Sequence, residues 1–316
     1  MNLGDAPIDE IEPSLPHPNR PRSGGFIIVA VLWILGALAT LAVIYSLYVR
    51  PTALSFVSHD ERLQAQAMAM SGMELAAYQL TKSSGTPPLS GQFAFNQGNA
   101  TISVRFVSEN ARIDLNFAPK QLLAGLLGEM GAPNDEALND ADRIIGWRSP
   151  LKSGGSDPEA ALYQAAGKSY GPRHGPFQHP DELALVADLS PTLVDRILPY
   201  VTVYSGRPEV NVLVAPPQVL DAVPGITPEL LRQLLTVRQS DPQDVVKAQL
   251  GLAGQFITLD PATTDRVTVT VQFPTGGRIR SQAVVLLSNA GGDPYRVLSW
   301  QDGEPSHDQD ADMSLQ

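Results

Sequence analysis

Residues 22–50 read RSGGFIIVAVLWILGALATLAVIYSLYVR, and this stretch decides the fold. The segment from Phe26 to Val49 contains no charged side chain. At about 1.5 Å per residue, a helix of this length spans roughly 36 Å, enough for a hydrocarbon core of roughly 30 Å. The sequence therefore predicts one membrane-spanning helix. We place its short N-terminal side in the cytoplasm, because the large polar remainder of the chain follows the helix.

The residues before the apolar run do not form an ordinary cleavable secretory signal. The apolar region is too long, acidic residues precede Arg20 and Arg22, and no small-x-small site follows. An uncleaved anchor is the simplest interpretation. The order of Arg22, two glycines and Phe26, however, resembles the prepilin processing site of type IV pilins and pseudopilins. The resemblance implies that a prepilin peptidase cuts after Gly25 and that Phe26 becomes an N-methylated N-terminus.

The fifth residue of that expected mature chain is Ala30, where most pilins and pseudopilins have glutamate. A carboxylate in hydrocarbon is costly unless it is paired. In these families it is thought to meet the N-terminal amine of the neighbouring subunit. The K-type minor pseudopilin has the same departure, which suits a subunit at the end of a fibre.

The helix is expected to continue beyond the membrane, with a kink at Pro51. Residues 53–82 carry apolar side chains at helical spacing, and Ser83 to Gly85 with two prolines should end the helix. The predicted buried stripe consists of Leu54, Val57, Leu63, Ala67, Met70, Met73, Ala77 and Leu80.

The remainder alternates between strand-like and helix-like patterns. Residues 91–115 and 255–301 have the alternation of strands, whereas 116–254 have helical periodicity broken by Pro and Gly. This order predicts a sheet interrupted by an inserted helical domain. Within the block, Ile113–Leu123 and Val210–Leu220 form a faint repeat, each an extended stretch followed by Ala-Pro and an apolar helix.

Several runs in this block resemble general secretion pathway protein K of type II secretion. They are GPFQHPDEL at 175–183, LSPTLV at 189–194, ILPYVTVY at 197–204 and VNV at 210–212. The resemblance extends from about Arg22 to Trp300. It implies an α+β, pilin-like fold in which a long N-terminal membrane-spanning helix packs on an antiparallel sheet that carries a large inserted all-helical domain.

The predicted segments are a leader (1–25), a membrane helix (26–49), an amphipathic helix with the first pilin strands (50–115), the helical insertion (116–254), returning strands (255–301) and an acidic disordered tail (302–316). The resemblance also implies a minor pseudopilin of the inner membrane that initiates and caps a periplasmic pseudopilus for the export of folded proteins. Its expected partners are I- and J-type minor pseudopilins, with an H-type as a further partner, the prepilin peptidase, the inner-membrane assembly platform and membrane lipid.

The family also suggests calcium, because K-type pseudopilins can bind it at loops rich in Asp, Asn and carbonyl oxygens. Asp260 and Asp265 are the candidate ligands near the returning strands. No other cofactor is expected. The chain has no cysteine, which excludes disulfides, thiol catalysis and zinc–thiolate sites.

Charge and motifs argue against other functions. The formal net charge is −11, of which residues 302–316 carry −5 and residues 1–25 carry −2, so nucleic acid is a poor partner. GKSYG at 167–171 matches a nucleophile motif only by chance, because a helical pattern precedes it. His174 and His179 read as loop residues, and VPGIT at 223–227 as a helical hairpin. We expect no enzyme. The alternative is a membrane-anchored periplasmic binding or hydrolytic protein, which would retain residues 1–25.

Overall fold

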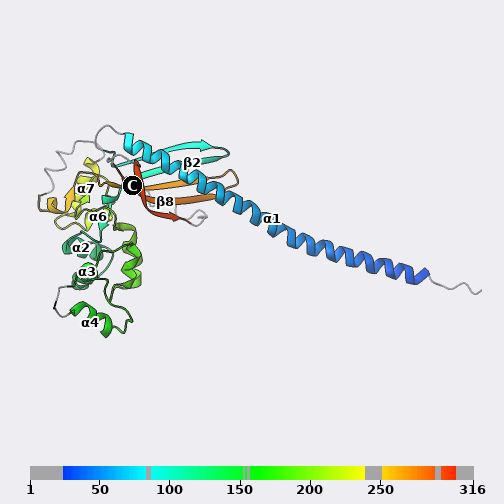
Figure 1. The fold of residues 1–316 in the computed structure, drawn as a ribbon, viewed down its shortest axis with the longest axis horizontal. Coiled ribbons are helices and arrows are strands. Elements are labelled where there is room, and N and C mark those ends of the chain that lie inside the picture. The colour runs from blue at the N-terminus through cyan, green and yellow to red at the C-terminus, as the bar shows by residue number, and fades with distance from the viewer. Residues whose placement is uncertain are drawn as a thin grey trace, which may run out of the picture. The chain divides into compact units, whose positions relative to one another are not determined.

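The computed structural model describes residues 24–82, 87–151, 154, 157–238, 251–288 and 293–303. By its internal contacts the chain divides into two units, Met1–Glu61 and Arg62–Gln316. Helix α1, Gly24–Lys82, contributes residues to both and continues without a break through Pro51 (Figure 1). The described part of the first unit is this helix alone. All but two residues of the predicted leader lie outside the described ranges.

The second unit contains a five-stranded antiparallel sheet in the order β1-β2-β7-β8-β9. The strands are β1 (Ser90–Gln97), β2 (Ala100–Ser108), β7 (Thr264–Gln272), β8 (Arg278–Leu287) and β9 (Tyr295–Asp302). Buried and exposed residues alternate along β2 and β7, as expected when one face of a sheet is covered. The α+β, pilin-like arrangement predicted from the sequence is confirmed.

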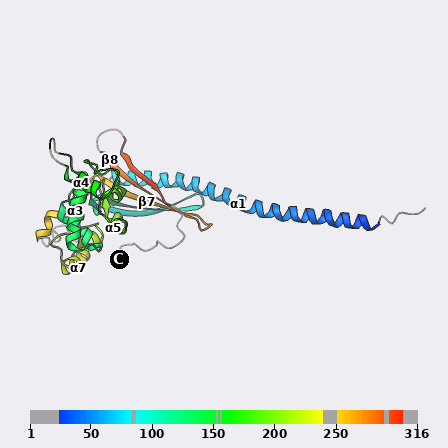
Figure 2. The same cartoon turned by 90° about the horizontal axis from the view of Figure 1, so that it is seen from below.

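Residues 62–82 of α1 cover one face of this sheet (Figure 2). Gly72 permits the close approach, because a Cβ there would lie 2.8 Å from Val269 Cγ1. The helix buries a stripe in which alanines alternate with larger apolar residues against the inner strand positions: Ala65, Met68, Ala69, Met73, Ala76 and Leu80. Small side chains let the helix lie close to the sheet, so valines of β7 contact it directly.

The predicted stripe of α1 was partly wrong. Met73, Ala77 and Leu80 are buried, but Leu63, Ala67 and Met70 are exposed. Two apolar stripes run along this segment, and periodicity alone does not say which one meets the sheet. The stripe that contains Ala65, Ala69 and Ala76 is buried because it allows the closer approach, and Leu63 and Met70 lie on the other side of the helix.

All residues from 109 to 263 lie between β2 and β7, two strands that pair directly with each other. They include the helices α2 (Lys120–Glu129), α3 (Asn134–Arg148), α4 (Pro158–Ala165), α5 (Pro191–Ile197), α6 (Pro217–Asp221) and α7 (Pro228–Val237). Short 3-10 helices occur at Glu109–Ala111, Pro180–Leu185, Leu198–Tyr200 and Gly251–Phe256. Residues 239–250 lie outside the described ranges.

The insertion begins earlier and ends later than predicted. Residues 111–115 were expected in the pilin sheet, but β3 (Ile113–Asp114) pairs in parallel with β4 (Val201–Thr202) inside the insertion. Likewise β6 (Ile257–Thr258) pairs with β5 (Val210–Asn211), and the returning strands start only at β7. Ile113 is fully buried in the core of the insertion, which explains why its strand-like pattern does not extend the sheet. At the other end, β9 reaches Asp302, one residue into the predicted tail.

The faint repeat has a structural counterpart. Asp114 and Asn211 occupy equivalent positions, and the side-chain Oδ1 of each accepts a hydrogen bond from the backbone N–H two residues later, at 2.8 and 2.9 Å. In each copy a two-residue parallel strand pair precedes an Ala-Pro helix start. The guanidinium of Arg148 donates to Ala118 O at 2.7 Å, and that of Arg238 to the equivalent Ala215 O, also at 2.7 Å.

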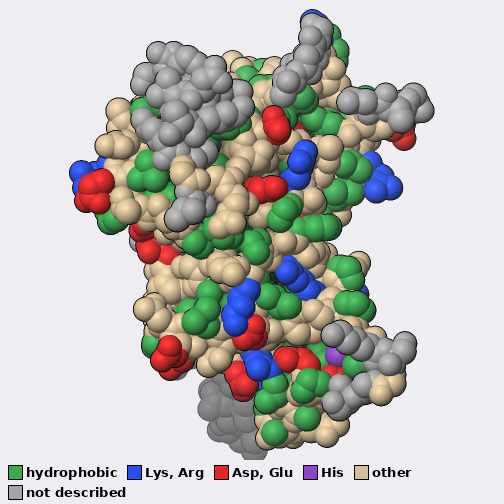
Figure 3. Space-filling view, turned by 90° about the vertical axis from the view of Figure 1, so that its left-hand side faces the viewer, with side chains coloured by type: hydrophobic (Ala, Val, Ile, Leu, Met, Phe, Trp, Pro, Cys, Tyr) green, Lys and Arg blue, Asp and Glu red, His purple; other side chains and the backbone are tan. Residues whose placement is uncertain are grey.

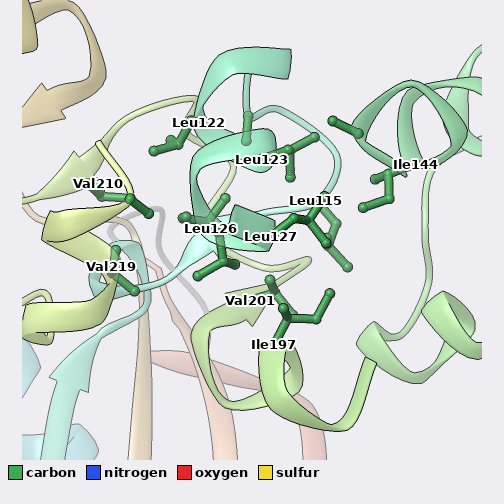
Figure 4. Packing of buried hydrophobic residues seen from close by; sticks show 14 of the residues in the cluster. Leu115, Leu122, Leu123, Leu126, Leu127, Ile144, Ile197, Val201, Val210 and Val219 are labelled. Carbon is green, nitrogen blue, oxygen red and sulfur yellow. The ribbon is translucent and has the colours of Figure 1, made fainter. Parts of the chain in front are cut away.

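The insertion has its own hydrophobic core, separate from that beneath α1. Four leucines of α2 project into it from both sides of the helix, as Figure 4 shows: Leu122, Leu123, Leu126 and Leu127. Gly125 brings α2 and α6 together, because a Cβ there would lie 2.0 Å from Ala222 O. On the outer surface of this part, acidic and basic side chains are interspersed (Figure 3).

Candidate functional site

The N-terminal part of α1 carries the predicted processing residues. Gly25 lies in its first turn, Phe26 is 79% exposed and Ala30 is half-buried. Residues Phe26–Ser46 form one helical segment that is long and apolar enough to cross a membrane. Residues 1–23 lie outside the described ranges, so the cleavage site remains a prediction.

A second surface lies on α1 in the other unit, on the side away from the sheet. We call it the outer stripe, formed by Leu63, Ala67, Met70 and Tyr78, which are spaced three to eight residues apart. Met70 is 63% exposed and Tyr78 56% exposed. Spacings of this kind place the side chains on one helix face. The outer stripe is therefore an exposed apolar helix surface, of the kind that packs against another helix.

Charged groups are buried where the insertion joins the sheet. Glu109, the first residue after β2, is fully buried and forms an ion pair with Arg266 of β7. Arg266 Nε donates to Glu109 Oε2 at 3.1 Å, and Thr202 Oγ1 donates to Oε1 at 2.6 Å. The carboxylate thus connects the sheet to β4 within the insertion. Buried charges are tolerated only with such pairing.

Two further groups extend this junction. Arg112 Nε donates to Pro199 O at 3.0 Å, and burial lowers the pKa of its guanidinium to about 10, with Arg266 acting in the same direction. Asp114 accepts hydrogen bonds from Ser205 Oγ and Gly206 N, each at 2.9 Å. Burial nevertheless raises the pKa of its carboxyl. These contacts tie the start of the insertion to its middle, across about ninety residues of chain.

The two calcium candidates are placed differently. Asp265 is 2% exposed on the sheet face that α1 covers, and burial, with the charge of Glu109, raises the pKa of its carboxyl to about 7. Asp260 is exposed, while its backbone oxygen accepts from Asn110 Nδ2 at 2.8 Å. Asn110 Oδ1 is buried without a hydrogen-bond partner.

Calcium needs six to eight oxygen ligands. Within the described ranges, no three acidic or histidine side chains gather as a metal site would require. Near Asp260, Asn110 Oδ1 is one oxygen without a hydrogen-bond partner. Calcium binding remains a prediction.

One family model matches the chain, that of type II secretion system protein K, over residues 104–206. The match begins in β2, crosses the buried junction at Glu109 and ends just after β4. We call this matched span, residues 104–206, the protein K domain. The match covers about one third of the chain. No curated protein sequence matches the chain.

The fold of the protein K domain and its surroundings also occurs in a solved structure. A chain of the GspK-GspI-GspJ complex from the enterotoxigenic Escherichia coli type 2 secretion system superposes with a TM-score of 0.56. The match covers 78% of this chain and 98% of that chain, with 16% identical residues. At 16% identity, the likeness shows a similar fold and nothing further.

The runs that carried the sequence resemblance lie in and beside the protein K domain core. Phe177 and Leu183 are buried, and Trp147 stacks on Phe177 with ring centroids 6.0 Å apart. The buried pair of Glu109 and Arg266 was not singled out from the sequence. The available signal was a charged residue beside or within a strand-like segment. It does not identify the pair, because the two partners are 157 residues apart in the sequence.

The motifs set aside earlier occupy ordinary positions. Ser169 follows helix α4 rather than a strand, so the arrangement of a nucleophile elbow is absent there. His174 bridges Ser149 O at 3.2 Å and Asp157 Oδ2 at 2.8 Å. His179 caps a 3-10 helix by accepting from Asp181 N at 3.2 Å. Both histidines thus support loop structure.

Proposed function

We propose that this protein is a minor pseudopilin that initiates and caps the periplasmic pseudopilus, anchored in the inner membrane by α1, and that its role is structural rather than enzymatic. The observation that carries the proposal is the insertion between β2 and β7, two strands that are direct neighbours in the pilin-like sheet. The sheet is kept whole while a second folded body is attached to it.

This architecture fits an end position for a steric reason. A shaft subunit must accept neighbours on both sides of its globular part. An added domain with its own core occupies space that the next subunit would need. Ala30 agrees with this position, because it offers no carboxylate to a neighbouring amine.

We propose that the outer stripe is where α1 meets the I- and J-type minor pseudopilins. The solved complex contains GspK together with GspI and GspJ, which supports partners of this kind. Leu63, Met70 and Tyr78 supply exposed apolar area for helix packing. Further expected partners are an H-type subunit, the prepilin peptidase and the assembly platform.

Site-specific cross-linking tests both points, and the absence of native cysteine makes it simple. A cysteine at Met70 should cross-link to I- or J-type subunits in cells that assemble pseudopili, whereas a cysteine at Lys168, in the insertion, serves as a matched surface control. In assembled fibres the protein should be found once, at an end. Repeated copies along the shaft would refute the capping role. Catalytic turnover by purified protein, or retention of Met1 in cells with a prepilin peptidase, would favour the anchored binding or hydrolytic alternative.

A further inference from the structure

The face of the sheet opposite α1 carries charge of one sign. Its side chains are those at alternate positions of each strand, since the intervening residues contact α1. Five arginines point to this side: Arg105, Arg266, Arg278, Arg280 and Arg296. The other outward positions of the described strands hold Ser, Thr, Asn, Gln, Ala, Val or Leu, with no Asp or Glu among them. We call this surface the arginine face.

Most of this charge is unneutralised within the described part of the chain. Arg266 pairs with Glu109, but the four others enter none of the ion pairs found among the described residues. Arg278 Nε donates to the neutral Gln272 Oε1 at 3.0 Å, and all four are exposed. An unneutralised cationic face is unexpected in a chain whose formal net charge is −11. A surface of this kind attracts anionic groups.

The described chain ends beside this face. Gly303 N donates to Arg280 O at 2.7 Å, continuing the pairing of β9 with β8 by one residue. Because the two strands are antiparallel, the chain at Gly303 runs toward Arg278. The residues that follow, 304–316, carry four carboxylates and no Lys or Arg: Glu304, Asp308, Asp310 and Asp312. They lie outside the described ranges.

We propose that this acidic C-terminal segment, residues 304–316, docks on the arginine face of its own chain. Its reach is sufficient, because thirteen residues extend to at most about 43 Å, while five strands are about 19 Å across at about 4.8 Å spacing. Single exposed ion pairs contribute little. The tether, however, gives millimolar effective concentration, so several weak pairs act together.

The full-length protein in detergent allows a direct test by disulfide formation. Ser103 is exposed on the arginine face between β1 and β7, and Met70 is exposed on α1, on the opposite side of the sheet. Each position is changed to Cys in combination with Ser314→Cys. Under mild oxidation at low salt, intramolecular cross-linking at position 103 should exceed that at position 70 by roughly fivefold, because docking raises the local concentration.

Charge must be the cause of that preference. In 0.5 M NaCl, where the screening length is about 4 Å, the ratio should fall several-fold, to the value that the tether alone gives. It should also fall with Arg278→Gln/Arg280→Gln and when the four tail carboxylates are changed to amides. Lys120→Gln/Lys168→Gln removes two positive charges elsewhere and should leave the ratio unchanged.

Three results would overturn the proposal. A ratio at low salt no higher than the ratio in 0.5 M NaCl would show no preference for the arginine face. A preference that survives both high salt and neutralisation of the tail would show that charge is not its cause. Disulfide-linked dimers that grow with protein concentration would assign the face to the tail of a second copy.

Discussion

Asp265→Asn should make the folded protein less sensitive to pH and more stable under mildly alkaline conditions. Asp265 is 2% exposed, and burial raises the pKa of its carboxyl from 3.8 to about 7. The folded protein therefore holds a proton between about pH 4 and pH 7 that the unfolded chain has released. The stability that this group contributes to the folded state is fully present below about pH 4 and is lost as the pH rises through 7.

The size of the effect follows from the same two values. A difference of about three pH units at 1.36 kcal/mol each corresponds to about 4 kcal/mol. Asparagine cannot ionise, so the variant should exceed the wild type by up to that amount at pH 8 and equal it within about 1 kcal/mol at pH 4. For a domain of this size, the difference in Tm at pH 8 is on the order of 10 °C.

Thermal unfolding followed by tryptophan fluorescence, from pH 4 to pH 8 with EDTA present, measures this difference. Asp260→Asn is the matched control, since Asp260 is exposed and should follow the wild type. Equal pH dependence of the wild type and Asp265→Asn would refute the reasoning. Repeating the series with calcium tests the predicted metal site. Binding there would raise the Tm of the wild type but of neither variant.

Other changes test other parts of the molecule. Gly25→Val should block leader removal and leave a precursor about 2.7 kDa heavier on a gel; normal processing would contradict the predicted cleavage site. Ala30→Glu should weaken membrane insertion by about 2.5–3.5 kcal/mol without increasing incorporation along the shaft, as fibre cross-linking would show. Glu109→Ala should lower the free energy of unfolding in urea by about 3–5 kcal/mol, because it leaves Arg266 without its partner. Adding Arg266→Met should recover most of that loss. An unchanged free energy of unfolding in Glu109→Ala would show that the ion pair is dispensable. Gly125→Ala should lower Tm by forcing α2 from α6; an unchanged Tm would show that the helices can separate freely.

The sequence predicted those features that depend on local patterns. The apolar run at 26–49, the hairpin of β1 and β2 and strand β8 all follow from hydrophobic periodicity and turn residues. The sequence-based prediction was wrong where two patterns fitted equally well, as with the two apolar stripes of α1, which have the same helical periodicity. It also failed at Ile113, whose alternating neighbours suit either sheet.

The buried junction could not be predicted for a different reason. The pairing of Glu109 with Arg266 depends on strands that meet only after the whole insertion has folded. A charged residue beside or within a strand-like segment is the local signal at both positions, and it does not distinguish a buried ion pair from a surface charge. Likewise, the arginine face becomes visible only when the order and register of the strands are known, because its residues are spread over four strands.

The placement of the insertion also sets a sequence of events during biogenesis. Strand β2 pairs with β7, so the central ladder cannot close until more than 150 further residues have been synthesised. Contacts of such long sequence separation form slowly. Until then, Ile102, Val104 and the buried stripe of α1 have no β7 to cover them, while α1 is already held at the membrane. The newly synthesised chain therefore passes through a stage with exposed apolar surface, and it is at this stage that a chaperone or an early partner would protect it from aggregation.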